Sequence, residues 1–131
     1  MPRLSPDGTL LAYIKGDSSQ SEVILRTYPE QAGQWQVSAD GGAYPVWSPK
    51  GDVIYYRDIA GQIFVVDVRR SPEVSLGTPR LIPRTGSLRA RFGFDVSPDG
   101  TRLLMVREVR TEDQAGPSLV VVLDWSAEFR K

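Results

Sequence analysis

Ser5-Pro6-Asp7-Gly8 is the first of three near-copies of one tetrapeptide, and the others are Ser48-Pro49-Lys50-Gly51 and Ser97-Pro98-Asp99-Gly100. Proline presets φ for the second position of a type I turn, and glycine readily adopts the left-handed conformation that the fourth position requires. Serine at the first position can hydrogen-bond a nearby backbone group. Each copy therefore predicts a tight turn that joins two strands of a hairpin.

Apolar runs recur at matching places around these turns. One run follows each glycine, and a second comes farther along the chain, so each turn is expected to introduce two strands rich in β-favouring residues. These runs cover residues 10–14, 53–56 and 103–106, then 23–25, 63–66 and 120–123. Inner strands are expected just before the second and third turns, at 43–47 and 91–96, and outer strands at 34–38 and about 78–82.

The copies begin at residues 5, 48 and 97, and repeats of about 40 to 45 residues are typical of four-stranded propeller blades. The sequence thus predicts an all-β fold of about three four-stranded antiparallel blades of an incomplete β-propeller. We expect one domain over 1–131, with blades at about 1–40, 41–88 and 89–124 and a C-terminal tail at 125–131. Trp125 and Phe129 are spaced for a helical turn that packs both rings on the last blade.

Composition excludes several classes of function. The chain is 40% hydrophobic and 24% charged, with 16 basic and 16 acidic residues. A nucleic-acid binder usually carries a basic excess, so no nucleic-acid partner is expected. No apolar run approaches the roughly 20 residues of a membrane span, so no membrane insertion by this chain is expected. The compartment stays open: a periplasmic parent and one attached to the inner membrane both fit.

The chain contains neither cysteine nor histidine. Thiolate nucleophiles, disulfides and thiolate metal sites need cysteine, and Ser-His-Asp or Cys-His catalysis needs an imidazole. No carboxylate pair is recommended by a motif for acid–base work. The sequence therefore predicts no enzymatic activity in this chain, no cofactor, no catalytic residue and no metal site.

The repeated turn, followed by an apolar strand, resembles the Pro-Asp variety of WD-like repeat found in the TolB-like β-propeller family. The segments 41–49, 76–81 and 94–100, with Leu123-Asp124-Trp125 near the end, resemble the C-terminal blades of bacterial propellers joined to kinase or regulator domains. The second turn departs from the family pattern because Lys50 stands where the family prefers aspartate. The resemblance implies a binding architecture that contributes no catalytic residues of its own.

Two functions follow from this interpretation. The first is a noncatalytic interaction scaffold for a protein, a peptide or another ligand, since propellers present loops around a channel. The alternative is an accessory gating or sensor propeller of a larger enzyme, either a prolyl-oligopeptidase-like peptidase or a serine/threonine kinase, whose catalytic domain lies outside this chain. Uncovered blade faces and free strand edges also predict self-association, for instance as two copies that complete a ring.

Asp95 and three arginines are the candidate contact residues for a partner. Asp95 is expected on an inner strand opposite the position of Val46, where a carboxylate must be paired or hydrated. A salt bridge with Arg91 or Arg102 is the structural explanation for it. Arginines can hold a carboxylate or phosphate, although a solvated inter-blade loop explains them equally simply; this candidate group is Arg84, Arg89 and Arg91, with Arg80 just before it.

Three further aspartates are better explained by turns than by metal binding. Calcium needs about six to eight oxygen ligands, and carboxylates in equivalent turns of different blades would not converge on one ion. We therefore expect Asp7 and Asp99 to stabilise their own turns. Asp40, before Gly41 and Gly42, is expected in a connection between two blades.

Overall fold

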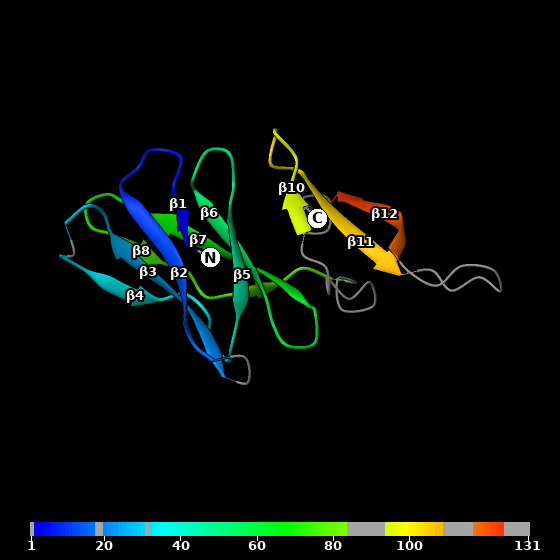
Figure 1. The fold of residues 1–131 in the computed structure, drawn as a ribbon. Coiled ribbons are helices and arrows are strands. Elements are labelled where there is room, and N and C mark those ends of the chain that lie inside the picture. The colour runs from blue at the N-terminus through cyan, green and yellow to red at the C-terminus, as the bar shows by residue number, and fades with distance from the viewer. Residues whose placement is uncertain (1, 18–19, 31, 84–93, 109–116, 125–131) are drawn as a thin grey trace.

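The computed structural model of the chain describes residues 2–17, 20–30, 32–83, 94–108 and 117–124. All regular structure in these ranges is β-strand, arranged as three antiparallel sheets that follow one another across the molecule (Figure 1). The predicted all-β fold, an incomplete β-propeller, is thereby confirmed. The predicted limits of the blades stay a prediction, so the structure is described below by its sheets.

The first sheet has its strands in chain order, β1-β2-β3-β4. Side chains alternate between its two faces: Leu10 and Ala12 are buried, whereas Leu11 between them is only half-buried. This alternation follows from the period of two residues in a strand. The strands are β1 (Arg3–Leu4), β2 (Leu10–Gly16), β3 (Ser21–Thr27) and β4 (Gln34–Gln36).

The second sheet has an outer strand in two pieces, β8 and β9, which both pair with β7. One outer strand was expected at about 78–82. The intervening Pro79 has no N–H to donate to a ladder, and Gly77 donates to the Asp67 carbonyl where β8 ends. The strands are β5 (Ala43–Trp47), β6 (Val53–Arg57), β7 (Ile63–Arg69), β8 (Ser75–Leu76) and β9 (Arg80–Leu81).

The third sheet has three strands within the described ranges, in the order β10-β11-β12. The inner strand expected at 91–96 is described from Phe94 onward. The tail at 125–131, with the helical turn expected there, lies outside the described residues. The strands are β10 (Phe94–Val96), β11 (Arg102–Glu108) and β12 (Pro117–Asp124).

The three repeated turns join β1 to β2, β5 to β6 and β10 to β11, as predicted. In each, the glycine N–H donates to the serine carbonyl at 2.9 Å. Gly8, Gly51 and Gly100 have φ of 75°, 73° and 76°, a region that L side chains rarely adopt. All three turns lie at the same end of the sheets (Figure 1).

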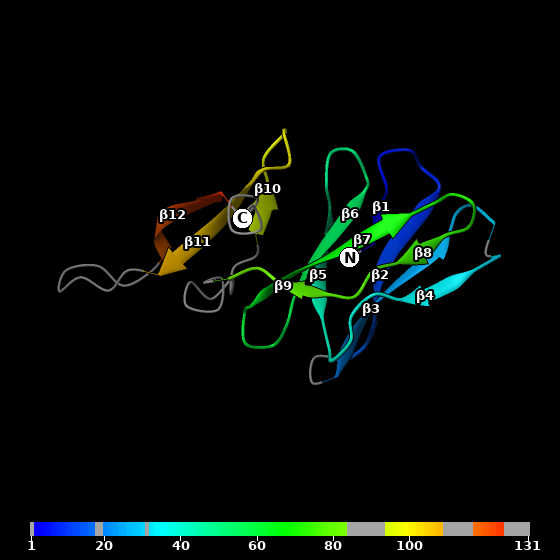
Figure 2. The ribbon, with the colours of Figure 1, turned by 180° about the vertical axis from the view of Figure 1, so that it is seen from behind.

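Two hydrophobic cores lie between the sheets, and β6 contributes to both. Ile54 and Tyr56 pack with residues of the first sheet, such as Leu10 and Val23. Tyr55, between them, packs in the other direction with residues of the third sheet, including Leu103. Because the side chains of a strand alternate, the second sheet is buried on both faces, between its two neighbours (Figure 2).

Candidate functional site

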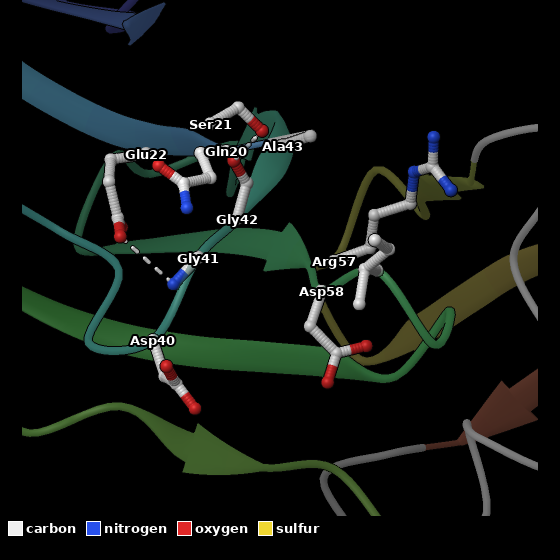
Figure 3. A pocket seen from close by; sticks show the side chains of 10 residues that line it. Gln20, Ser21, Glu22, Asp40, Gly41, Gly42, Ala43, Arg57 and Asp58 are labelled. Carbon is white, nitrogen blue, oxygen red and sulfur yellow. Dashed lines mark hydrogen bonds between the residues drawn. The ribbon is translucent and has the colours of Figure 1, made fainter. Parts of the chain in front are cut away.

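A hollow of about 520 Å³ lies between loops of the first and second sheets, at the end away from the three turns. Three segments line it: residues 20–22 at the start of β3, residues 40–43 leading into β5, and residues 57–59 between β6 and β7. Figure 3 shows the lining side chains. The loops of two adjacent sheets thus form a single concave surface, the kind of place where propellers bind ligands.

Glu22 fixes one wall of the hollow. Its carboxylate accepts a hydrogen bond from the Gly41 N–H at 3.0 Å and another from the Ser38 hydroxyl (Figure 3 shows the first). Ser38, which is buried, also accepts a bond from the Val23 N–H at 2.9 Å. These bonds tie the loop before β5 to β3, so Glu22 is a structural carboxylate.

Gly42 brings the same wall close to the core. A Cβ at this position would lie 2.8 Å from both the Tyr56 ring and the Ser38 Cβ, so only glycine fits. The Gly42 N–H donates to the Ser21 carbonyl at 2.9 Å, and the Ser21 hydroxyl donates back to the Gly42 carbonyl at 3.0 Å. The wall is therefore rigid before any ligand arrives.

Asp58, on the opposite wall, is occupied by its own loop. Its carboxylate accepts bonds from the Ala60 N–H at 3.0 Å, the Gln62 N–H at 2.8 Å and the Gln62 side-chain amide at 2.9 Å. A carboxylate with three donors closes a turn. Asp58 therefore shapes the loop and offers little to a ligand.

Arg57 and Asp40 differ from these two carboxylates. Within the described ranges, neither forms an ion pair or a side-chain hydrogen bond. Asp40 is exposed, whereas the Arg57 Nε is buried without an acceptor. In Figure 3 the Arg57 side chain extends away from Asp40 and Asp58. The hollow thus presents one cation and one anion at separate places.

Tyr44 supports the Arg57 guanidinium, which lies over the tyrosine ring at 5.3 Å from its centroid. Tyr44 has φ of 60°, and it alone among the described non-glycine residues has a positive φ. It stands where the register of β5 against β6 shifts, between Ala43 and Val46. Its ring is 37% exposed and lies 6.3 Å from that of Phe94. Unusual backbone of this kind gathers at binding sites.

Asp95 lies on β10 and is exposed, and its carboxylate accepts the Val96 N–H at 2.8 Å. Among the described residues it has no ion-pair partner, and Arg102 does not pair with it. The candidate arginines 84, 89 and 91 lie outside the described residues. Arg80 pairs with Asp67 at 3.2 Å, a contact within the second sheet. Sequence reasoning therefore did not identify the residues that line the hollow.

Asp7 and Asp99 stabilise their turns, as expected. Each accepts the hydroxyl of the turn serine at 2.6 Å, and the pKa of each is lowered to about 2, mainly by this bond. Bonds from Thr9 and Thr101 lower these pKa values further. In the second turn Asp52 takes over, accepting the Ser48 hydroxyl at 2.8 Å. The carboxylate that Lys50 lacks is supplied two residues later.

The described part of the chain contains no group of three or more histidine, cysteine, aspartate or glutamate residues arranged to hold a metal ion. It also contains no helix with the length and apolar character needed to cross a membrane.

No family model and no curated protein matches the chain. Three solved structures are similar to it. They are TolB from Acinetobacter baumannii (20% identity, TM-score 0.65), and proteins assigned as 6-phosphogluconolactonases from Bacteroides uniformis (21%, 0.55) and Bacteroides fragilis (17%, 0.57). Each match covers 95% of this chain, and respectively 29%, 41% and 37% of the solved one.

These similarities support a TolB-like propeller fold, and at this level of identity they carry information on fold alone. The chain spans less than half the length of each solved structure. A signal for the hollow was nevertheless present in the sequence: Gly41-Gly42 precede an aromatic residue and Pro45, a composition typical of irregular backbone.

Proposed function

We propose that this chain is a noncatalytic scaffold that binds a protein or peptide through the hollow between its first and second sheets. The observation that carries the proposal is the combination of rigid walls, fixed by Glu22 and Gly42, with two charges that have no partner in the described structure, Arg57 and Asp40. Pre-formed concave sites with a few polar groups are typical of binding sites.

The chemistry of the hollow supports binding over catalysis. The chain has no histidine or cysteine to act as base or nucleophile. Glu22 and Asp58 are the carboxylates nearest the walls, and both hold backbone N–H groups of neighbouring loops. Neither is free to exchange a proton with a substrate while it holds its loop.

Selection of peptides from a display library on the immobilised full chain tests the proposal. Asp40→Arg serves as the blocking variant, because Asp40 is exposed and a larger cation there would obstruct the hollow. Lys50→Glu is the matched control, an exposed charge reversal at the turn end. We expect selected peptides to bind the wild type and Lys50→Glu equally and to lose at least tenfold in affinity for Asp40→Arg. Equal binding to all three proteins would refute the role of the hollow.

A lactone hydrolase is the competing function, because two similar structures are assigned as 6-phosphogluconolactonases. Incubation of the full chain with 6-phosphogluconolactone distinguishes the two. Our proposal predicts a hydrolysis rate equal to that of buffer alone. Hydrolysis above this rate that is lost in an Asp40→Asn or Arg57→Gln variant would replace the binding proposal with an enzymatic one.

The proposal for the whole protein is a larger bacterial propeller, in which this chain corresponds to the C-terminal blades beside a kinase or regulator domain. The alternative is the accessory gating or sensor propeller of a prolyl-oligopeptidase-like peptidase or a serine/threonine kinase. The neighbouring gene sequence tests both. Kinase signature loops would favour the sensor, and a Gly-x-Ser-x-Gly elbow with a distant histidine would favour the peptidase.

A second copy of the chain is a further proposed partner. Leu4 on the first sheet and Leu104 on the third are 47% and 36% exposed. Equivalent faces already pack against each other inside the chain, so the outer faces of two copies can repeat that packing head to tail. Light scattering tests this: we expect a mass above that of the monomer, decreased by Leu104→Glu. A monomer at all concentrations would contradict it.

A further inference from the structure

Arg57 is the group in the hollow whose surroundings indicate a particular ligand. Resting on the proposed function, we infer that the Arg57 guanidinium, held against Tyr44, anchors a single carboxylate group of the bound peptide. The Arg57 Nε is buried and has no acceptor among the described residues. A buried donor without an acceptor is unfavourable, and a bound carboxylate would remove that cost.

The acidic neighbours of Arg57 do not neutralise it. Asp58, the next residue, is held by three donors from residues 60 and 62. Glu22 is held by Ser38 and Gly41. Asp40 lines the same hollow, and Figure 3 shows the Arg57 side chain directed away from it. The positive charge of Arg57 is thus available within the described structure.

Tyr44 fixes the position of this charge before a ligand binds. The Arg57 guanidinium lies 5.3 Å from the centroid of the tyrosine ring, a cation–π geometry that restricts a long flexible side chain. The ring is placed by a positive φ of 60° and by the register shift in β5. A backbone arrangement that costs energy and turns an aromatic ring to the surface is common at binding sites.

The charges around the hollow favour a carboxylate over a phosphate. A guanidinium binds a planar carboxylate through two parallel hydrogen bonds. Asp40 and Asp58 line the same hollow, so a dianionic or polyanionic ligand would meet repulsion that a single carboxylate largely avoids. Two sources share this chemistry, the C-terminal carboxylate of a peptide and the side chain of an aspartate or glutamate.

Three peptides of one selected sequence test the inference and distinguish the sources. The first has a free C-terminus and no acidic side chain, the second has one glutamate and an amidated C-terminus, and the third is amidated with glutamine replacing glutamate. Affinity is measured by calorimetry on the full chain, and the Arg57 Nε–Hε signal is followed by NMR. We expect one of the first two peptides to bind at least tenfold more tightly than the third and to shift that signal.

Variants of Arg57 and a matched arginine complete the test. Arg57→Gln should remove the tenfold preference for the carboxylate peptide, and Arg57→Lys should retain only part of it, because the planar fork is lost. Arg26→Gln is the control: Arg26 also lies over a tyrosine, Tyr13, at 5.2 Å, and its Nε also has no acceptor, yet it does not line the hollow. It should keep the full preference.

Each remaining outcome overturns a stated part. Equal affinity for all three peptides in the wild type, with binding still lost in Asp40→Arg, would overturn the carboxylate inference and leave the proposed function intact. A preference that survives Arg57→Gln would assign the carboxylate to another residue. Failure of every peptide to bind would overturn the proposed function and this inference together.

Discussion

Arg70 and Arg57 lie at opposite ends of the second sheet, and each is stacked on an aromatic ring. The Arg70 guanidinium lies 5.7 Å from the ring of Trp47, and that of Arg57 lies 5.3 Å from the ring of Tyr44. Arg70 also pairs with Asp7 of the first turn at 2.9 Å and donates to the Gly51 carbonyl of the second turn at 2.7 Å. Arg57 makes no such contact within the described ranges.

This difference teaches that the two ends of the sheets have different tasks. At the turn end, charges are paired across neighbouring sheets, so they stabilise the fold. At the hollow end, Arg57 and Asp40 have no partner among the described residues, so they can contribute to binding at little cost to stability. The residue type is the same at both ends, and the contacts distinguish the roles.

The largest expected effect on this comparison is that of Gly51→Val. A Cβ at Gly51 would lie 3.2 Å from Pro6 and 3.3 Å from Arg70, and φ is 73°. We expect a loss of about 2–4 kcal/mol in the free energy of unfolding from the left-handed backbone, the β-branched side chain and the displaced Arg70. Urea denaturation measures it.

Gly8→Val is the matched control for this prediction. Gly8 has nearly the same φ, 75°, but its Cβ would meet nothing within 4 Å. The loss there should be about 1–2 kcal/mol, from the backbone conformation alone. Equal losses at the two positions would show that the packing between the first and second turns adds no stability.

Arg70→Gln should have the next largest effect. It removes the ion pair with Asp7, the bond to the Gly51 carbonyl and the stacking on Trp47. Because the paired side chains are 29% and 45% exposed, solvent weakens the ion pair, and we expect a total loss of about 1–2 kcal/mol. Arg57→Gln should change unfolding by at most about 0.5 kcal/mol. The reverse order would break the comparison.

The pH dependence of the turn end gives a smaller effect. The pKa of Asp7 and of Asp99 is about 2, below the ordinary 3.8, mainly because Ser5 and Ser97 donate to them. A lowered pKa in the folded state stabilises the fold at pH above 3.8, and this contribution is lost as pH falls toward 2. Carboxyl titration by NMR should give both midpoints near 2. Ordinary midpoints would mean that the turn bonds are weak in solution.

Asp40→Asn should have the smallest effect on stability. The side chain is exposed and has no hydrogen bond or ion pair within the described ranges. We expect the free energy of unfolding to change by no more than about 0.5 kcal/mol. Thermal or urea unfolding checks this, and a loss above about 1 kcal/mol would show that Asp40 belongs to the structural network around Glu22.

Sequence reasoning predicted the turn end well because that end depends on local chemistry. Serine, proline and glycine act within a few residues, so three copies indicate three hairpins. The same reasoning could not place the Asp52 bond to Ser48, since Lys50 broke the pattern. It also placed one outer strand where Pro79 divides two, a consequence of how β7 pairs on its free side.

The hollow could not be predicted in the same way because it depends on loops from two sheets. Glu22 and Gly41 are far apart in the sequence and meet only when the first and second sheets pack. Tyr44 supports Arg57 because of a register shift and a positive φ that its residue type does not favour. Asp40 was considered only as a turn residue, and Arg57 was not considered at all.

The central claim is that the hollow end binds a partner and the turn end only holds the sheets together. The most direct test is an NMR map of a selected carboxylate peptide on the isotope-labelled full chain. The account predicts shifts at the Arg57 Nε–Hε and at the backbone amides of Gly41, Gly42 and Tyr44, with Ser5, Ser48 and Ser97 unchanged. Shifts confined to those three serines and their turns would contradict it.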